Sequence, residues 1–173
     1  MAEELNKLKQ LYLIRHAKSS WSNLKISDFD RPLNQRGKRE APLMAERLAH
    51  HGVCPDALIS SPAKRAKATA EIVARKVKYP VKRIHYEDSI YTSATIDLLR
   101  VLQKIDNRIE TAFLVGHNYA ITDLAVMLTG EYISKIPTSG VVAMDLSVTT
   151  WGEVGAGRGN MLFFDYPKKH EEG

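Results

Sequence analysis

The sequence predicts an α/β protein, a three-layer α/β/α sandwich around a mainly parallel sheet, with an antiparallel hairpin at its C-terminal end. Through most of the chain, short apolar runs alternate with longer segments of helical periodicity. Right-handed crossovers between such units keep the strands parallel. Towards the end, two strand-like segments, residues 141–148 and 161–164, are separated by the glycine-rich residues 152–159, which favours a hairpin.

The first strand is expected over residues 10–15, and a polar loop containing proline separates it from a helix over residues 35–50. Asn34 precedes this helix and is a residue type that caps helix N-termini. Gly52 follows it, in the position where a helix usually stops. The apolar face of the helix is formed by Ala41, Leu43, Met44 and Leu48.

The second unit repeats this plan. Residues 56–60 are predicted to form a short buried strand, followed by a helix that Ser61 caps and that has Pro62 at its first position. The apolar stripe of this helix is formed by Ala66, Ala70, Val73 and Val77.

The remaining parallel part has two further strands and two further helices. Strands are predicted over residues 81–86 and 111–115. One helix is predicted to begin at Thr95, and another to span about residues 120–128.

Length and composition are those of an ordinary globular protein. We expect the 173 residues to form a single domain, with a core over about residues 10–166 and polar termini. A chain of this length buries about two-thirds of its unfolded surface. The formal net charge of +5 is modest and spread along the chain. An anionic small substrate or a phosphoprotein explains it as well as nucleic acid does, and we do not expect nucleic-acid binding.

Further classes are excluded by what the sequence lacks. The single cysteine, Cys54, cannot form an intrachain disulfide, and a zinc cluster is not expected. Residues 1–10 are polar and lack the apolar core of a signal peptide, and no stretch approaches the roughly 18 apolar residues of a membrane helix. We therefore expect a cytoplasmic protein that does not bind membranes, without a metal or other cofactor.

Two of the predicted strands end in a histidine. Arg15 and His16 follow the apolar residues 11–14, and His117 follows the apolar residues 112–115 by one glycine. Open α/β sheets bind ligands at the carboxyl ends of their strands. We expect these residues to converge there with Arg65, which lies in the first turn of the helix after the second strand.

Arginines and histidines in this arrangement suit phosphoryl transfer. An arginine fork can hold two phosphoryl oxygens at once, and the N-terminus of the helix after Ser61 adds backbone N–H donors. A neutral imidazole can act as a nucleophile, whereas the second imidazole is more useful when protonated, as another donor to the phosphoryl group.

Four motifs resemble those of the histidine phosphatase superfamily, which includes the phosphoglycerate mutases. They are residues 13–18 (Leu-Ile-Arg-His-Ala-Lys), residues 30–37, residues 60–70 and residues 115–118, and they follow the family's order. The short chain and residues 28–33 (Asp-Phe-Asp-Arg-Pro-Leu) are most similar to the SixA-type phosphohistidine phosphatases. The resemblance implies a phosphoglycerate mutase-like fold and hydrolysis of phosphohistidine in a partner protein.

The resemblance also implies roles for single residues. His16 becomes the residue that is phosphorylated, and Arg15, Arg65 and His117 complete the phosphate pocket without a metal. Two further candidates for phosphate contact follow from the motifs. Asn118 lies beside His117, and Ser22 follows Trp21 where the mutase-like members carry asparagine.

A general acid is not evident, because the chain lacks the insertion that carries it in the larger mutases. Glu87 and Asp88 are the nearest carboxylates, and both are equally compatible with solvated loop charges. Imidazole leaves phosphohistidine with less help than an alkoxide needs, since the unperturbed pKa of its conjugate acid is about 6.5. The missing acid therefore favours a phosphoramidate or another activated substrate over a simple alkyl phosphate.

Two other functions stay open at this point. The chain could be a phosphatase or mutase of a small phosphorylated metabolite, although it has little insertion with which to enclose one. It could also be an inactive module that binds phosphate or a phosphoprotein.

Overall fold

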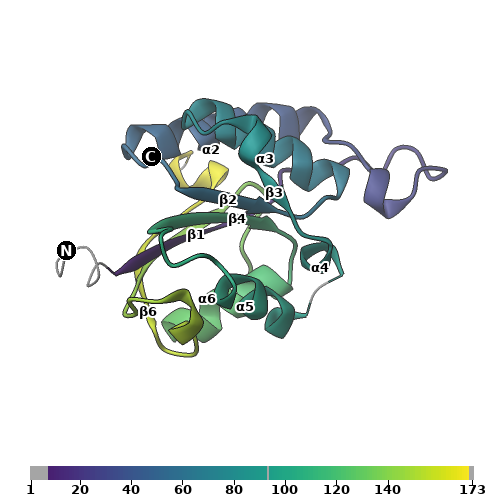
Figure 1. Ribbon diagram of the computed structural model, residues 1–173. Helices are drawn as coiled ribbons and strands as arrows, with labels where there is room; N and C mark the ends of the chain where they lie inside the picture. Colours follow the sequence, from purple (N-terminus) through teal and green to yellow (C-terminus); the bar gives the residue numbers. More distant parts are fainter. Residues whose placement is uncertain (1–7, 93, 172–173) are drawn as a thin grey trace.

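The computed structural model describes residues 8–92 and 94–171, so most of the polar termini expected from the sequence lie outside the described residues. The strands form one six-stranded sheet in the order β3-β2-β4-β1-β5-β6 (Figure 1). Their bounds are β1 Lys9–Arg15, β2 Ala57–Ser60, β3 His85–Tyr86, β4 Thr111–Gly116, β5 Val141–Leu146 and β6 Gly159–Asp165.

The sheet is parallel on one side and antiparallel on the other. Strand β1 pairs in parallel with β4, and β2 pairs in parallel with both β4 and β3. On its other side β1 pairs antiparallel with β5, which pairs antiparallel with β6. The predicted mainly parallel sheet with a C-terminal antiparallel pair is confirmed, although the connection between β5 and β6 contains a short 3-10 helix, Trp151–Glu153.

Helices cover both faces of the sheet. Helices α2 (Gln35–His50) and α3 (Lys64–Lys76) lie on one face, and α5 (Thr95–Gln103) and α6 (Ala120–Thr129) lie on the other (Figure 1). The short helix α4 (Asp88–Tyr91) stands near the carboxyl end of β3. None of the helices in the described part of the chain is long and apolar enough to cross a membrane.

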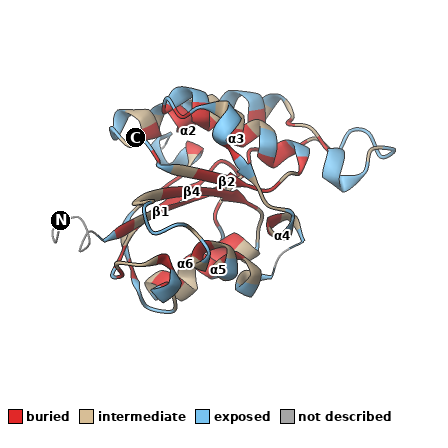
Figure 2. Ribbon diagram, in the orientation of Figure 1, coloured by how far each residue is buried: buried red, intermediate tan, exposed pale blue. Residues whose placement is uncertain are grey.

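The alternation of side chains along β1 creates two cores. Tyr12 and Ile14 pack under α2 and α3, whereas Leu11 and Leu13 pack against α5 and α6. The strands at the centre of the sheet are buried, and exposed residues gather on the outer sides of the helices (Figure 2). The three-layer α/β/α sandwich is thereby confirmed.

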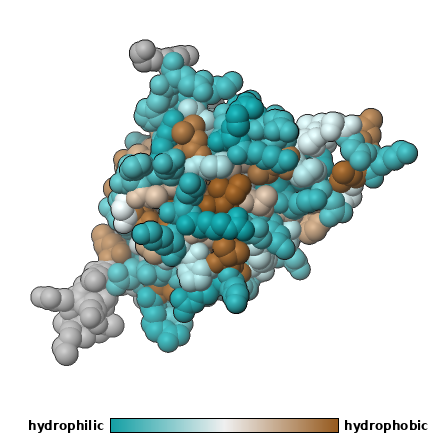
Figure 3. Space-filling model, turned by 90° about the horizontal axis from the view of Figure 1, so that it is seen from above, coloured by the Kyte–Doolittle hydropathy of each residue, from teal (hydrophilic) through white to brown (hydrophobic). Residues whose placement is uncertain are grey.

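Helix α2 has the predicted bounds because its caps act locally. The Asn34 side chain accepts a hydrogen bond from the amide of Gly37, and Gly52 adopts a φ of +72° after the helix ends. Leu43 does not belong to the buried face as predicted, since it is 41% exposed. The face seen over α2 and α3 is largely hydrophilic, with scattered apolar areas (Figure 3).

Two predicted elements have different bounds. Helix α3 begins at Lys64 rather than Pro62, because the Ser61 hydroxyl accepts from the amide of Ala63 and caps the turn that precedes the helix. Of the strand predicted over residues 81–86, only His85–Tyr86 pairs with β2. Residues 81–83 form a 3-10 helix instead, in which the amide of Arg83 donates to the carbonyl of Pro80 and is turned away from the sheet.

Candidate active site

The carboxyl ends of β1, β2 and β4 meet at one edge of the sheet and bring two histidines together. The amide of His16 donates to the carbonyl of Gly116 at 3.1 Å, which fixes the residue after β1 beside the end of β4. The rings of His16 and His117 lie 5.1 Å apart between their centroids. The topology therefore juxtaposes two residues that are distant in sequence.

His16 is buried, with 7% of its surface exposed, and its ring has a defined tautomer. Its Nδ1 lies 2.7 Å from the carbonyl oxygen of Ala17, and because a carbonyl only accepts, Nδ1 carries the proton. The hydroxyl of Thr69 holds the amide of Ala17 at 2.9 Å. Burial lowers the pKa of His16 to about 3, so at neutral pH Nε2 keeps its lone pair.

His117 is held from two sides. Its Nε2 lies 2.8 Å from the Ser61 hydroxyl, and its Nδ1 lies 3.4 Å from Nη2 of Arg65. A guanidinium only donates, so Nδ1 accepts and Nε2 carries the N–H. Burial, followed by the charge of Arg65, lowers the pKa of His117 to about 4. The ring is thus neutral at pH 7, where a protonated ring was expected, and its one N–H donates to the Ser61 hydroxyl.

Arg65 joins this group from the first turn of α3, with only 6% of its surface exposed. Its Nη1 donates to the main-chain carbonyl of Asp28 at 2.7 Å, and its Nη2 donates to the Asp28 carboxylate at 3.1 Å. The Thr69 hydroxyl donates to the carbonyl of Arg65, one helical turn back. The guanidinium is thereby fixed in direction beside His117.

Asp28 is a member of this site that the sequence did not single out. It also accepts from the Tyr91 hydroxyl at 2.8 Å and from Nε of Arg31 at 3.1 Å. Partial burial raises the pKa of Asp28, but the bond from Tyr91 and the charges of Arg65 and Arg31 outweigh this effect and bring the pKa to about 2. The carboxylate is therefore ionised at neutral pH.

Tyr91 is the second residue that sequence reasoning missed. It comes from α4, which was expected to be loop, and its ring packs edge-on against Phe29 at 5.1 Å and against His117 at 5.7 Å. A signal for Asp28 existed in the segment Asp-Phe-Asp-Arg-Pro-Leu. No local signal marked Tyr91, because its partners lie far away in the sequence.

Arg15 and Asn118 share a partner on the other side of His16. Nη1 of Arg15 donates to the carbonyl of Ile136 at 2.9 Å, and the Asn118 amide donates to the same oxygen at 3.2 Å. The Asn118 side-chain oxygen accepts from Thr122, so both ends of this amide have protein partners. Nε of Arg15 is buried and has no hydrogen-bond partner.

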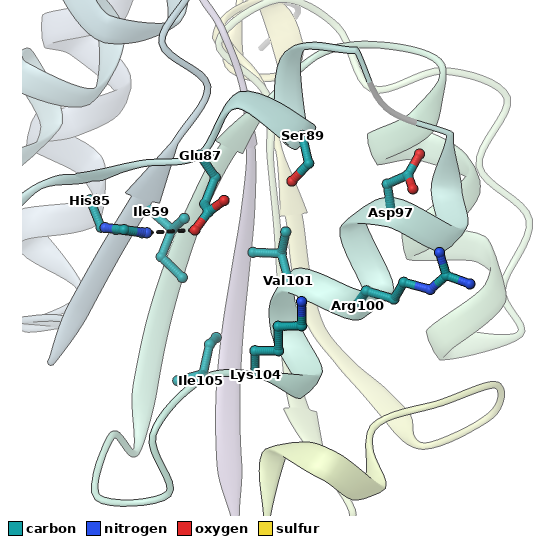
Figure 4. Close-up of a pocket in the computed structure, with 9 residues that line it drawn as sticks. All are labelled: Ile59, His85, Glu87, Ser89, Asp97, Arg100, Val101, Lys104 and Ile105. Carbon is teal, nitrogen blue, oxygen red and sulfur yellow. Dashed lines mark hydrogen bonds and ion pairs between the residues drawn. The ribbon is translucent and has the colours of Figure 1, made fainter.

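The other predicted site residues lie outside this group. Ser22 is exposed in the projecting segment of residues 20–30, and its hydroxyl lies 2.8 Å from that of Ser20. Oε1 of Glu87 lies 2.6 Å from Nε2 of His85, at hydrogen-bond distance, and Glu87 faces a cavity between β3 and α5 (Figure 4). Asp88 lies in the first turn of α4. A role for Glu87 or Asp88 as general acid stays a prediction.

Comparisons with known proteins agree with this architecture. The model of the histidine phosphatase superfamily (branch 1) matches residues 11–86. An uncharacterised chloroplast protein of Arabidopsis thaliana is 31% identical over 153 residues, which cover 84% of this chain and 70% of that protein. An uncharacterised protein of Mycobacterium tuberculosis H37Rv is 30% identical over 165 residues, covering 90% of this chain and all (100%) of the other.

Solved structures have the same fold. The candidate phosphohistidine phosphatase SixA from Agrobacterium tumefaciens superposes with a TM-score of 0.80 at 28% identity, covering 92% of this chain and 99% of that one. A protein histidine phosphatase SixA complexed with tungstate superposes with a TM-score of 0.78 at 23% identity, covering 91% of this chain and 97% of that one.

The fold and the paired histidines at the sheet edge define a class of protein, an α/β enzyme that removes phosphoryl groups from phosphorylated substrates. The chain belongs to the histidine phosphatase superfamily, and its fold is that of the SixA-type branch.

Proposed function

We propose that this protein is a phosphohistidine phosphatase that acts on a phosphorylated protein and uses His16 as its nucleophile. The observation that carries the proposal is the neutral imidazole of His16, with Nδ1 bound to a carbonyl and Nε2 unprotonated. The likeness to SixA of Agrobacterium tumefaciens supports the same substrate class. A cytoplasmic location is part of the proposal.

The reaction has two displacements. In the first, the substrate ring carries a proton on its other nitrogen, the lone pair on Nε2 of His16 attacks phosphorus, and the P–N bond of the substrate breaks. Its electron pair stays on the departing nitrogen, so a neutral imidazole leaves. In the second, water attacks the phosphorus on His16, the P–Nε2 bond breaks with its electron pair returning to Nε2, a proton of the water goes to solvent, and inorganic phosphate leaves. Arg15 and Arg65 stabilise the charge on the phosphoryl oxygens in both steps, and the N–H of His117 joins them by turning from the Ser61 hydroxyl, its partner in this structure.

The ionised state of Asp28, the carboxylate that contacts Arg65, supports phosphohistidine as the substrate rather than an alkyl phosphate. Asp28 contacts Arg65, but a group with a pKa of about 2 is ionised and has no proton to give to a leaving alkoxide. A leaving imidazole, whose conjugate acid has a pKa of about 6.5, needs less assistance.

The rim of the site supports a protein substrate. Large side chains on and near this edge are exposed, namely those of Trp21, Leu24 and Tyr119. Such side chains can contact the surface around a phosphorylated residue, whereas a small metabolite is usually enclosed.

The test compares purified wild type with His16→Ala on a phosphohistidine peptide, a phosphoserine peptide and a small phosphate ester. His16→Ala should lose phosphate release from the phosphohistidine peptide while its circular dichroism spectrum is retained. Wild type should carry a base-stable phosphoryl label on His16 after rapid quenching. His85→Ala, which removes an exposed histidine, is the matched control and should keep full activity. Full activity of His16→Ala would contradict the mechanism, and a preference for the ester would contradict the substrate.

A further inference from the structure

A second cavity adjoins the site at Arg15 and is strongly basic. Its volume is about 360 Å³, and it is lined by Arg15, Lys18, Arg36, Lys135, Pro137 and Thr138. Arg15 also lies close enough to His16 and His117 for its charge to lower the pKa of both rings. One arginine thus belongs both to the phosphate pocket and to this second cavity, which we call the basic cavity.

The backbone builds the basic cavity from three segments. The amide of Asn34 donates to the carbonyl of Lys18, and Gly37 lies so close to that carbonyl that a Cβ atom there would be 2.2 Å from its oxygen. This contact places Lys18 beside the first turn of α2, which carries Arg36. Lys135 precedes Ile136, whose carbonyl binds Arg15.

Most of the positive charges that line the basic cavity have no negatively charged partner in the described part of the chain. Arg36 pairs with Glu40 at 2.9 Å. Among the described residues, neither Lys18 nor Lys135 has an ion pair or a side-chain hydrogen bond, and Nε of Arg15 is buried without a partner. Four cationic side chains that line one cavity repel each other, and an anion placed between them removes this repulsion and provides partners for their donors.

We infer that the basic cavity binds a carboxylate of the substrate, an acidic residue that flanks the phosphohistidine, so that the enzyme prefers acidic sequences. The inference rests on the proposed function. Arg15 contributes to the phosphate pocket and to the basic cavity. The phosphoryl group and the carboxylate are therefore held about one side chain apart, which is the separation of neighbouring residues in a peptide. Lys135 lines the cavity and is exposed, so a side chain from another protein can reach it.

The test uses two phosphohistidine peptides that differ only in carrying glutamate or glutamine on both sides of the phosphohistidine. We expect wild type to prefer the glutamate peptide by about tenfold in kcat/KM, the value of one charge-assisted contact. Lys135→Ala should reduce this ratio severalfold, and Lys135→Glu should invert it. Lys82→Ala, which removes an exposed lysine elsewhere, should leave the ratio at the wild-type value.

Three results would overturn the inference. Equal kcat/KM values for the two peptides in wild type overturn it while the proposed function stands. A preference for a small bisphosphate over its monophosphate, with both peptides hydrolysed alike, assigns the cavity to a second phosphate instead. Failure to hydrolyse either peptide removes the proposed function, and the inference with it.

Discussion

Arg65 donates to Asp28 through both of its terminal nitrogens, to the main-chain carbonyl at 2.7 Å and to the carboxylate at 3.1 Å. The fork that we assign to the phosphoryl group therefore already holds a carboxylate. This carboxylate comes from a 3-10 helix, Asp28–Asp30, at the base of the projecting segment. An incoming phosphoryl group has to share the guanidinium with Asp28 or displace it.

Asp28→Asn should bind tungstate or inorganic phosphate about fivefold more tightly than wild type. The substitution keeps an acceptor for Arg65 and removes a negative charge near the anion, a repulsion of about 1 kcal/mol at a partly exposed site. Isothermal titration calorimetry measures the difference. Asp30→Asn removes the same charge two residues away, where the carboxylate is bonded to Ser27, and should change the affinity little. Weaker binding by Asp28→Asn would show that the carboxylate positions Arg65 rather than competing for it.

Arg65→Ala should weaken the binding of the same anions by about tenfold or more, since charge-assisted hydrogen bonds contribute roughly 1.5–3 kcal/mol. The matched control is Arg75→Ala, which removes an exposed arginine from the last turn of the same helix. The same calorimetric titration serves both variants. If the two bind phosphate equally well, Arg65 does not belong to the pocket.

Gly37→Ala should lower the free energy of unfolding by about 1–3 kcal/mol, the usual cost of overpacking. The added methyl group would meet the main-chain carbonyl of Lys18, which the amide of Asn34 holds in place. Urea denaturation measures the loss. Gly155→Ala adds a methyl group where no atom lies within 4 Å and should be nearly neutral. Equal stabilities of the two variants would mean that the contact between α2 and residue 18 is loose.

Acidification should destabilise the fold below pH 6.5. Burial holds the pKa of His16 at about 3 and that of His117 at about 4, whereas both titrate near 6.5 in the unfolded chain. Between these values the unfolded chain binds protons that the folded chain does not, so the free energy of unfolding falls as the pH drops from about 6.5 to 4.5. Above pH 7 neither ring contributes.

Denaturation of wild type and His16→Gln from pH 4.5 to 7.5 tests this dependence. The variant cannot titrate at position 16, and its stability should fall less steeply on acidification. Identical slopes for wild type and His16→Gln would contradict a depressed pKa at His16.

The elements that the sequence predicts well are those whose signals are local. Helix α2 has the predicted bounds, because Asn34 and Gly52 act on their immediate neighbours. Strands β1 and β4 are short apolar runs, and they are buried on both faces of the sheet. This pattern is typical of strands in a parallel sheet. The shortened β3 was not predictable, since the amides of Arg83 and Ile84 donate within a local turn that the side chains of residues 81–84 do not reveal.

The candidate site likewise contains residues that the sequence predicts and residues that it does not. The strand ends place His16 and His117 together, because the topology of parallel units determines where such ends meet. The hydrogen bonds that Asp28 accepts from Arg65 and Tyr91 depend on how a loop and the four-residue helix α4 pack across the edge of the sheet. Periodicity carries no information on such packing.

Strand β1 lies between β4 and β5, so its hydrogen-bonding partners are residues 111–116 and 141–146. During synthesis, the segment that carries His16 is made before both of these and has no strand to pair with until they follow. Residues 11–86, which the family model matches, thus contain an apolar strand without its neighbours. The candidate site cannot assemble until residues 141–146 have been made, and until then the nascent chain exposes a strand that chaperones can bind.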